Sequence, residues 1–146
     1  MPKDIVKEVL SYAKRDKVSF IDLQFTDFLG NLKNSTIPVY NLEEALTRGV
    51  WIDGSSIEGF ARIHESDMYL MPDPATYAVL PWRNDVETGG KVARIICDVY
   101  KPNHEPFEGD PRNILKRVLA EAKSLGFDYY TGPECEFFMF PRDENG

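Results

Sequence analysis

Residues 53–60, which read DGSSIEGF, combine an acid, two serines and two glycines between apolar flanks. An Asp-Gly pair commonly forms a tight turn, because glycine accepts positive φ and aspartate can bond to nearby backbone. An ordinary loop is therefore one interpretation. Trp51, Ile52 and Phe60, however, place apolar bulk on both sides of the small polar centre, as at interfaces between proteins. The segment is thus also a candidate for a functional loop that contacts a partner.

A second stretch whose residues could take part in chemistry is GPECEFFMF, residues 132–140. Strand periodicity places Glu134 and Glu136 on one face, and the apolar residues that follow occupy both faces. A strand that is apolar on both sides is usually central and buried. Two buried carboxylates require compensation, and Mg²⁺ or Mn²⁺ with oxygen ligands would supply it. The alternative is a strand whose first half is exposed, with both glutamates hydrated, and the spacing alone does not decide.

The composition of the 146-residue chain limits the classes of function. Its 42% hydrophobic content can form a core, and its net charge of -7 argues against nucleic-acid binding, which needs a basic face. Cys97 and Cys135 lie in separate apolar stretches without metal-ligand spacing, so buried free thiols in a reducing cytosol are expected. The first residues lack the apolar core of a signal peptide, and no apolar run reaches the ~18 residues of a membrane span. We therefore expect a cytoplasmic protein with no membrane or nucleic-acid partner.

Mixed helices and strands must position these two stretches. Helical periodicity covers residues 4–16, and alternation then predicts a hairpin of strands at 18–27 and 31–38. Asn41 and Glu44 resemble a capping box that opens a short helix ending at Arg48. Strands are predicted at 67–71, 76–82 and 91–100. Because strands and helices do not alternate regularly, the class is α+β, and the order of elements suggests a β-grasp-like sheet.

A proline-rich stretch without periodicity divides the chain. Residues 1–101 form the predicted β-grasp-like domain, 102–110 a linker, and 111–146 the beginning of a second α+β domain. Asp110 is the predicted N-cap of a helix, with Pro111 at its first position and Gly126 as its stop. The strand at 132–140 follows. The sequence ends directly after this strand in a turn-like cluster, which is compatible both with a natural C-terminus and with a domain cut off within its fold.

Four motifs in the same order resemble glutamine synthetase of the bacterial and archaeal type I: IDGSSIEGF, ESDMYLMPD, PFEGDPRN and GPExEFFxF. The resemblance runs over nearly the whole chain but covers only the N-terminal portion of that longer family. It implies a complete β-grasp domain at 1–101 and the first helix and strand of a truncated catalytic domain at 111–146. It also implies a reaction in which ATP activates the γ-carboxylate of glutamate as γ-glutamyl phosphate, which ammonia converts to glutamine.

The resemblance also assigns residues. Glu134 and Glu136 match ligands of two divalent metal ions, Mg²⁺ or Mn²⁺. Asp53 matches the aspartate that binds ammonium and takes its proton, Ser56 matches a serine of the same site, and Arg62 matches an arginine that senses glutamine in feedback inhibition. Family subunits form a dodecamer of two stacked hexameric rings, so the loop with Asp53 would be donated to a neighbouring subunit. His64 and His104 lack metal-ligand spacing and are interpreted as surface histidines, and Asp67 as part of a solvated rim.

Two other functions remain open on the sequence. A related γ-glutamyl ligase could use polyamines or other amines in place of ammonia. The chain could also act as a non-catalytic β-grasp interaction module. Under the synthetase hypothesis, the 146 residues alone are expected to be inactive, because the nucleotide pocket and further metal ligands are missing from them.

Overall fold

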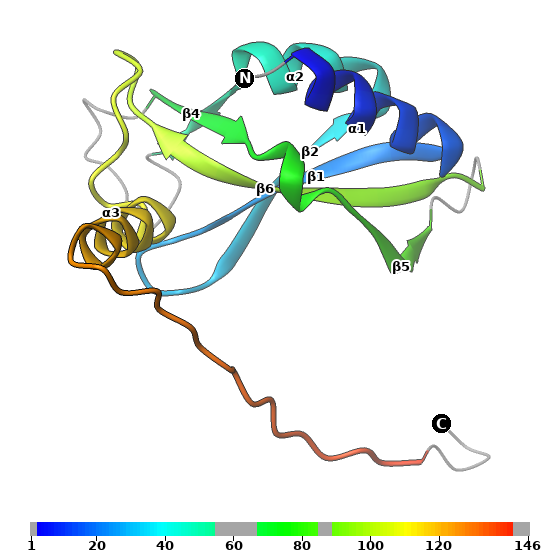
Figure 1. Cartoon of the computed structure of the whole chain (residues 1–146). Helices are drawn as coiled ribbons and strands as arrows, with labels where there is room; N and C mark the ends of the chain where they lie inside the picture. The colour runs from blue at the N-terminus through cyan, green and yellow to red at the C-terminus, as the bar shows by residue number, and fades with distance from the viewer. Residues whose placement is uncertain (1–2, 55–66, 85–88, 142–146) are drawn as a thin grey trace.

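The structure is a computed structural model that describes residues 3–54, 67–84 and 89–141 (Figure 1). Its elements in chain order are α1 (Lys3–Arg15), β1 (Val18–Thr26), β2 (Leu32–Pro38), a 3-10 turn (Val39–Asn41), α2 (Leu42–Arg48), β3 (Val50–Asp53), β4 (Asp67–Pro72), a second 3-10 turn (Pro74–Thr76), β5 (Ala78–Asn84), β6 (Lys91–Tyr100) and α3 (Pro111–Ser124). Helices and strands are mixed without regular alternation. The predicted α+β class with a β-grasp-like N-terminal part is confirmed.

Six strands form the sheet in the order β2-β1-β6-β4-β3, with β5 also paired to β6. The predicted hairpin of β1 and β2 is present, and its turn is organised by Asp27. The side chain of Asp27 accepts hydrogen bonds from the Leu29 and Asn31 N–H groups at 3.0 and 2.8 Å. Pairing of β1 with β6 is parallel, whereas β3–β4 and β4–β6 are antiparallel. The central strand β6 therefore connects the hairpin to the β3–β4 edge.

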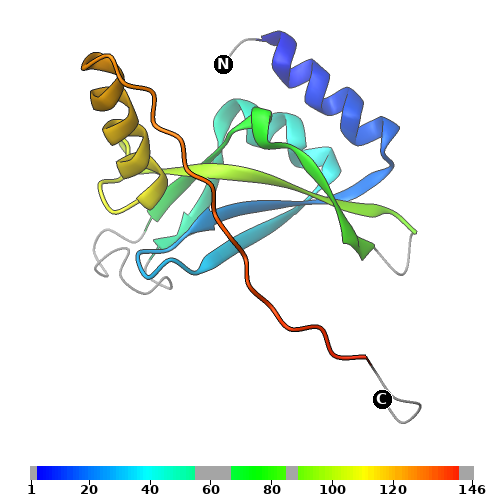
Figure 2. The ribbon, with the colours of Figure 1, turned by 60° about the horizontal axis from the view of Figure 1, so that its bottom comes forward.

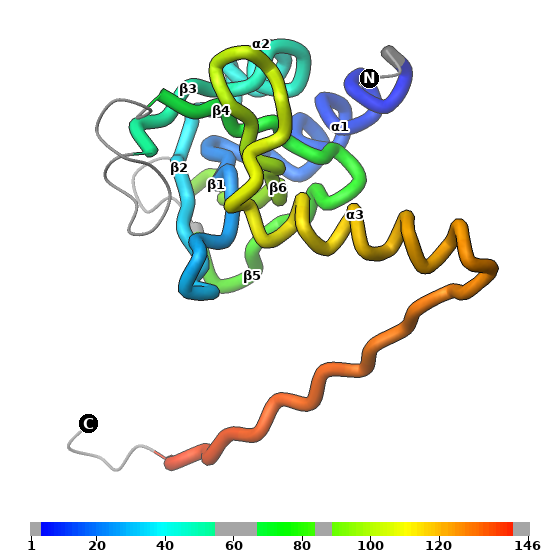
Figure 3. The backbone as a smooth tube through the Cα atoms, turned by 90° about the vertical axis from the view of Figure 1, so that its left-hand side faces the viewer, coloured from blue at the N-terminus to red at the C-terminus, as the bar shows by residue number. Residues whose placement is uncertain are grey.

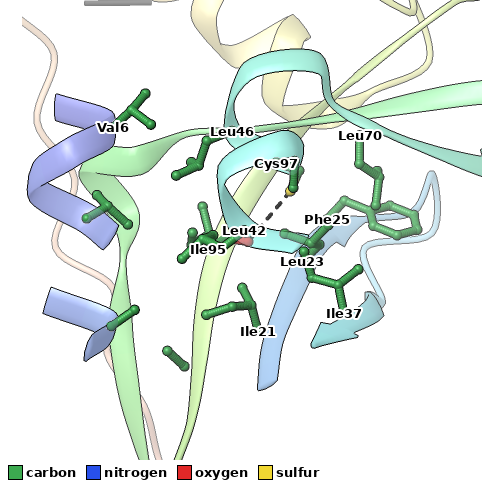
Figure 4. Close-up of a cluster of buried hydrophobic side chains, with 14 of the residues drawn as sticks. Val6, Ile21, Leu23, Phe25, Ile37, Leu42, Leu46, Leu70, Ile95 and Cys97 are labelled. Carbon is green, nitrogen blue, oxygen red and sulfur yellow. Dashed lines mark hydrogen bonds between the residues drawn. The ribbon is translucent and has the colours of Figure 1, made fainter. Parts of the chain in front are cut away.

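Helices α1 and α2 cover one face of the sheet and enclose the core (Figures 1 and 4). Alternation along β1 directs Ile21, Leu23 and Phe25 to this face, as predicted. Leu42 and Leu46 of α2 pack against them. The Cys97 thiol belongs to the same cluster, and burial raises its pKa above the usual range. Cys97 is thus the expected buried free thiol.

The opposite face of the sheet carries polar groups, and some are buried. Asp22 on β1 is only 1% exposed, because Arg83 of β5 forms an ion pair with it. Thr36 of β2 also donates a hydrogen bond to the Asp22 carboxylate at 2.7 Å. Side chains from β2, which pairs with β1, and from β5, which pairs with β6, therefore compensate a carboxylate that alternation had placed on the less buried side.

Three local predictions differ from the structure. The Asn41 side chain makes no capping bond within the described residues, because a 3-10 turn runs directly into α2 and leaves Asn41 with helical angles. Strand β3 was not predicted, and it pairs with β4 over four residues. The strand predicted from residue 76 begins at Ala78, because Asp73 caps a 3-10 turn by accepting from the Ala75 N–H at 3.1 Å.

Both predicted ends of α3 are confirmed. The Asp110 side chain accepts from the Arg112 N–H at 3.0 Å, and Pro111 occupies the first helical position. Gly126 has a φ of +85°, and the Gly126 and Phe127 N–H groups donate back to the Lys123 and Ala122 carbonyls. This pair of bonds is the Schellman arrangement, which favours glycine at the position with positive φ.

Residues 127–141 follow α3 as an extended segment that leaves the sheet (Figures 1 and 2). No strand pairs with them in the described part of the chain. The predicted strand at 132–140 is therefore wrong for this structure, since an extended segment becomes a strand only when a neighbour supplies hydrogen bonds. None of the helices described here is long and apolar enough to cross a membrane.

Candidate functional site

Asp53 is the last residue of β3, at the open edge of the sheet. Its cross-strand partner in the register is Asp67, the first residue of β4. Both residues are exposed, and together with Trp51 and Ile52 they line a shallow hollow. Like charges directly opposite each other weaken strand pairing. The sequence interpretation placed Asp67 on a solvated rim, and the structure confirms its exposure but adds the direct pairing with Asp53.

Aromatic rings lie beside this pair of carboxylates. The ring centroids of Trp51 and Tyr69, which are also cross-strand partners, are 3.7 Å apart. The ring of His104, from the loop between β6 and α3, stacks on Tyr69 with 5.0 Å between centroids. His104 is a surface residue, as predicted, but it also has an aromatic partner that no local spacing indicated.

Ser56 and Arg62, the other predicted residues of the loop, lie outside the described residues, as does His64. Their predicted roles in ammonium binding and feedback therefore remain predictions. The structure describes the loop only up to Gly54, which is buried immediately after Asp53. Gly54 is therefore the last described residue before the loop, and it is buried.

Glu134 and Glu136 lie in the extended segment after α3 and are exposed, as is Cys135 between them. Of the two alternatives left open for the glutamates, the exposed one holds in this structure, and the prediction that the Cys135 thiol is buried is wrong. The alternation itself is visible, because the Phe138 and Phe140 rings lie 6.4 Å apart. The segment is extended but, within the described residues, has neither neighbouring strands nor the cover that burial requires.

The two predicted half-sites do not meet within this chain. Asp53 lies at the β3 edge, whereas the segment with Glu134 and Glu136 runs away from the sheet (Figures 1 and 3). Among the described residues, no group of three or more His, Cys, Asp or Glu side chains is arranged to hold a metal ion. Glu134 and Glu136 are nevertheless the right chemical type, because carboxylate oxygens are the ligands that Mg²⁺ and Mn²⁺ prefer.

The first turn of α3 is bound to the sheet by three side chains that we call the α3 anchor: Asp110, Arg112 and Asn113. Asp110 accepts from the Val99 N–H at 2.9 Å, and the Asn113 amide donates to the Val99 carbonyl at 2.9 Å. Both side chains are buried. Asp110 and Asn113 thus give hydrogen-bond partners to both the N–H and the carbonyl of Val99, as a neighbouring strand would. These bonds attach the helix to the sheet.

Arg112 completes the anchor by pairing with Asp98 of β6 and with Asp73, each at 2.6 Å. Burial by itself would raise the pKa of Asp73, but hydrogen bonds from Arg112 and Ala75 and nearby positive charges lower it below the usual range. For Asp110, burial prevails over its hydrogen bonds and raises the pKa. The PFEGDPRN motif contains all three anchor residues, but the sequence analysis interpreted Asp110 only as a helix cap.

Comparison with known proteins identifies the two parts of the chain. Residues 17–102 match the glutamine synthetase beta-Grasp domain, and residues 108–146 match the glutamine synthetase catalytic domain. The chain is 53% identical over 146 residues to glutamine synthetase from Clostridium saccharobutylicum, which covers 100% of this chain and 32% of that protein. It is 53% identical over 141 residues to glutamine synthetase from Staphylococcus aureus strain Mu50, covering 96% of this chain and 31% of that protein. The chain thus spans about a third of the length of these relatives.

Solved structures show the same fold. A GmaS–ADP complex matches with a TM-score of 0.71 and 26% identity, covering 80% of this chain and 26% of the GmaS chain. Glutamine synthetase from Plasmodium falciparum matches with a TM-score of 0.71 and 24% identity, covering 83% of this chain and 23% of that one, which shows the fold alone. Since the two matched domains follow each other in order and together cover most of its length, the chain belongs to the glutamine synthetase family.

Proposed function

We propose that the protein containing this chain is a glutamate–ammonia ligase. ATP would phosphorylate the γ-carboxylate of glutamate, and ammonia would displace phosphate from the γ-glutamyl phosphate to give glutamine. The observation that carries this proposal is the 53% identity over all 146 residues to a bacterial glutamine synthetase. On this proposal, the chain supplies the N-terminal domain at 1–101, a linker at 102–110 and the beginning of the catalytic domain at 111–146.

Asp53 is the proposed catalytic residue of this chain. Its carboxylate would attract ammonium as a cation and then accept a proton, because only neutral ammonia has the free electron pair that attacks an acyl phosphate. An exposed position at the end of an edge strand supports this role, since a substrate can reach the carboxylate from outside the sheet. Ser56, three residues further along the chain, would complete the ammonium site.

Glu134 and Glu136 are the proposed ligands of divalent metal ions, Mg²⁺ or Mn²⁺. Their carboxylates supply two hard oxygen donors two residues apart, a spacing that would place both on one face of a strand. Such ions, when bound, neutralise charge on the phosphoryl oxygens of ATP, which is the co-substrate. The remaining ligands would come from parts of the protein beyond these residues.

We further propose that the protein is a cytoplasmic dodecamer of two hexameric rings, in which the Asp53 loop reaches the active site of a neighbouring subunit. The exposed indole of Trp51, at 54%, supports a contact surface beside Asp53. Arg62 would sense glutamine for feedback inhibition.

The test is glutamine formation by the complete protein with Asp53→Asn and Asp53→Ala. We expect turnover with ammonia to fall at least tenfold in both variants while the dissociation constant for ATP stays within about twofold, because Asp53 touches ammonium and not the nucleotide. Unchanged turnover would contradict the role of Asp53. A preference of the unaltered protein for putrescine over ammonia would instead identify a polyamine ligase and contradict the proposed reaction.

A further inference from the structure

The strand that carries Asp53 is a short edge strand. β3 has four residues and lies at the edge of the sheet, and within the described part of the chain β4 is the strand that pairs with it. Edge strands are held by one neighbour only and open more readily than central ones. The facing carboxylates of Asp53 and Asp67 weaken the pairing further at this end. The position of this end of β3, and with it the direction of the Asp53 side chain, therefore depends on how the neighbouring side chains pack.

Three aromatic rings contact one another in a row beside this edge of the sheet. Trp51 contacts Tyr69 with 3.7 Å between ring centroids, and Tyr69 contacts His104 at 5.0 Å. Because side chains alternate along a strand, Trp51 and Asp53 project from the same face of β3. Trp51 also lines the hollow that contains Asp53 and Asp67. The outermost ring of the stack is thus a wall of the ammonium site proposed above.

His104 is held in place by its own loop, which returns beside β4 after β6 ends (Figures 1 and 3). The His104 N–H donates to the Lys101 carbonyl at 2.9 Å, and the Lys101 N–H donates to the Glu105 carbonyl at 2.8 Å. His104 has a φ of +63°, in the left-handed region that is uncommon for residues other than glycine, although histidine, asparagine and aspartate enter it more often than most. The loop therefore keeps a less favourable conformation at the residue whose ring reaches Tyr69.

We propose that His104 is a positioning residue for the ammonium site: through Tyr69 it holds the Trp51 ring and so fixes the end of β3 from which Asp53 projects. This inference rests on the proposed function. His104 itself touches neither ammonium nor ATP on this proposal. Loss of its ring would therefore weaken the capture of ammonium and leave nucleotide binding unchanged.

The test compares two substitutions of His104 in the complete protein. Asparagine tolerates the left-handed conformation but has no ring, so His104→Asn removes the stack and keeps the loop. His104→Phe keeps a ring. We expect His104→Asn to raise the KM for ammonium about fivefold, which is ~1 kcal/mol, with the KM for ATP unchanged. His104→Phe keeps the ring but tolerates positive φ less well, so it should be impaired clearly less than His104→Asn.

A second pair of variants tests the other end of the stack. Trp51→Leu should raise the KM for ammonium at least as much as His104→Asn does. Trp82→Leu should leave it unchanged, because Trp82 is an exposed tryptophan on β5, a strand that pairs with β6 and not with β3. Combining Trp51→Leu with His104→Asn should add little, since both act through one stack.

The positioning role of His104 and the proposed function would be contradicted by different results. An unchanged KM for ammonium in His104→Asn, or equal impairment of His104→Asn and His104→Phe, would overturn the positioning role while glutamine synthesis itself remains measurable. Absence of glutamine synthesis in the unaltered protein would instead contradict the proposed function. In that case the fluorescence of Trp51 can still be used to follow the ring stack. It is obtained by subtracting the emission spectrum of a protein that carries Trp51→Leu from that of the same protein without this substitution. It should shift in His104→Asn and not in His104→Phe.

Discussion

The sheet with α1 and α2 differs from the segment of α3 and residues 127–141 in what happens to apolar side chains. In the first region they meet one another, and Leu23, Leu46 and Ile95 are almost fully buried (Figure 4). In the second region Leu115 and Val118 remain about half exposed, and Phe138 is 89% exposed. The local sequence is equally suited to structure in both regions. The difference shows that caps and periodicity can form a helix, but burial depends on having partners along the chain.

The thiols should show the largest contrast between the two regions. Cys97 is buried beneath the helices, whereas Cys135 is exposed. Labelling of the native 146-residue chain with an aromatic disulfide reagent should therefore modify Cys135 at least ~1,000-fold faster than Cys97, since Cys97 reacts only after opening of the sheet. Mass spectrometry of the labelled peptides measures both rates. Comparable rates would mean that the core around Cys97 opens freely.

Two helical leucines sharpen the same comparison. Leu46 on α2 is 1% exposed and Leu115 on α3 is 51% exposed. Leu46→Ala should lower the free energy of unfolding by about 3 kcal/mol because it leaves a cavity, whereas Leu115→Ala should change it by less than ~1 kcal/mol. Urea unfolding followed by far-UV circular dichroism measures both. Equal effects would show that α3 is more deeply packed than the structure has it.

Two glycines with similar φ angles allow the cost of backbone strain to be compared with the cost of a steric clash. Gly49 and Gly126 have φ of +78° and +85°. A Cβ at Gly49 would lie 2.5 Å from the Met71 sulfur and 2.9 Å from the Leu70 carbonyl oxygen, while one at Gly126 would meet nothing within 4 Å.

Both alanine substitutions strain the backbone, so Gly126→Ala should cost about 1 kcal/mol and Gly49→Ala about 1–2 kcal/mol more. The midpoints of thermal unfolding, measured by calorimetry, provide the comparison. Identical midpoints would exclude the close approach of α2 to β4 at Gly49.

The smallest predicted effect concerns the ion pair that joins the two regions. The pKa of Asp73 is lowered by Arg112 in spite of burial. The resulting stability is fully present above the unfolded pKa near 3.8 and is lost as pH falls through the lower folded pKa.

Asp73→Asn should therefore reduce stability by up to about 1 kcal/mol at pH 6 and make the loss on acidification less steep. Urea unfolding at a series of pH values between 6 and 2.5 measures the slope. Asp128→Asn, which removes an exposed pair with Lys123, is the matched control. A slope in Asp73→Asn equal to that of the unaltered chain would contradict the prediction.

Features that depend on neighbouring residues were predictable from the sequence. The hairpin of β1 and β2, the Asp110 cap and the Gly126 stop follow from alternation and from side chains within a few positions. Contacts between distant residues were not predictable in this way. The parallel pairing of β1 with β6 and the anchoring of Asn113 on Val99 are examples.

The candidate site shows the same division. Motifs singled out Asp53, Glu134 and Glu136, but the pairing of Asp53 with Asp67 depends on β3, which is too short for its alternation to be recognised. The Tyr69–His104 contact joins residues more than thirty positions apart. Burial of the segment 132–140 could not be judged from its own residues, because an apolar strand is buried only when other strands lie against it.

The α3 anchor has a mechanical consequence. A helix of 14 residues, at 1.5 Å per residue, is ~21 Å long, and this one is fastened to β6 through its first turn. Lys116, one turn further on, also pairs with Asp98 of β6, so the helix is held near its start and can act as a lever arm with its pivot there. A rotation of about 5° at the pivot would move the far end, where the segment with Glu134 and Glu136 begins, by ~2 Å. Stiffness at Asp110, Arg112 and Asn113 thus sets how accurately the sheet that carries Asp53 and the segment that carries the glutamates keep their spacing.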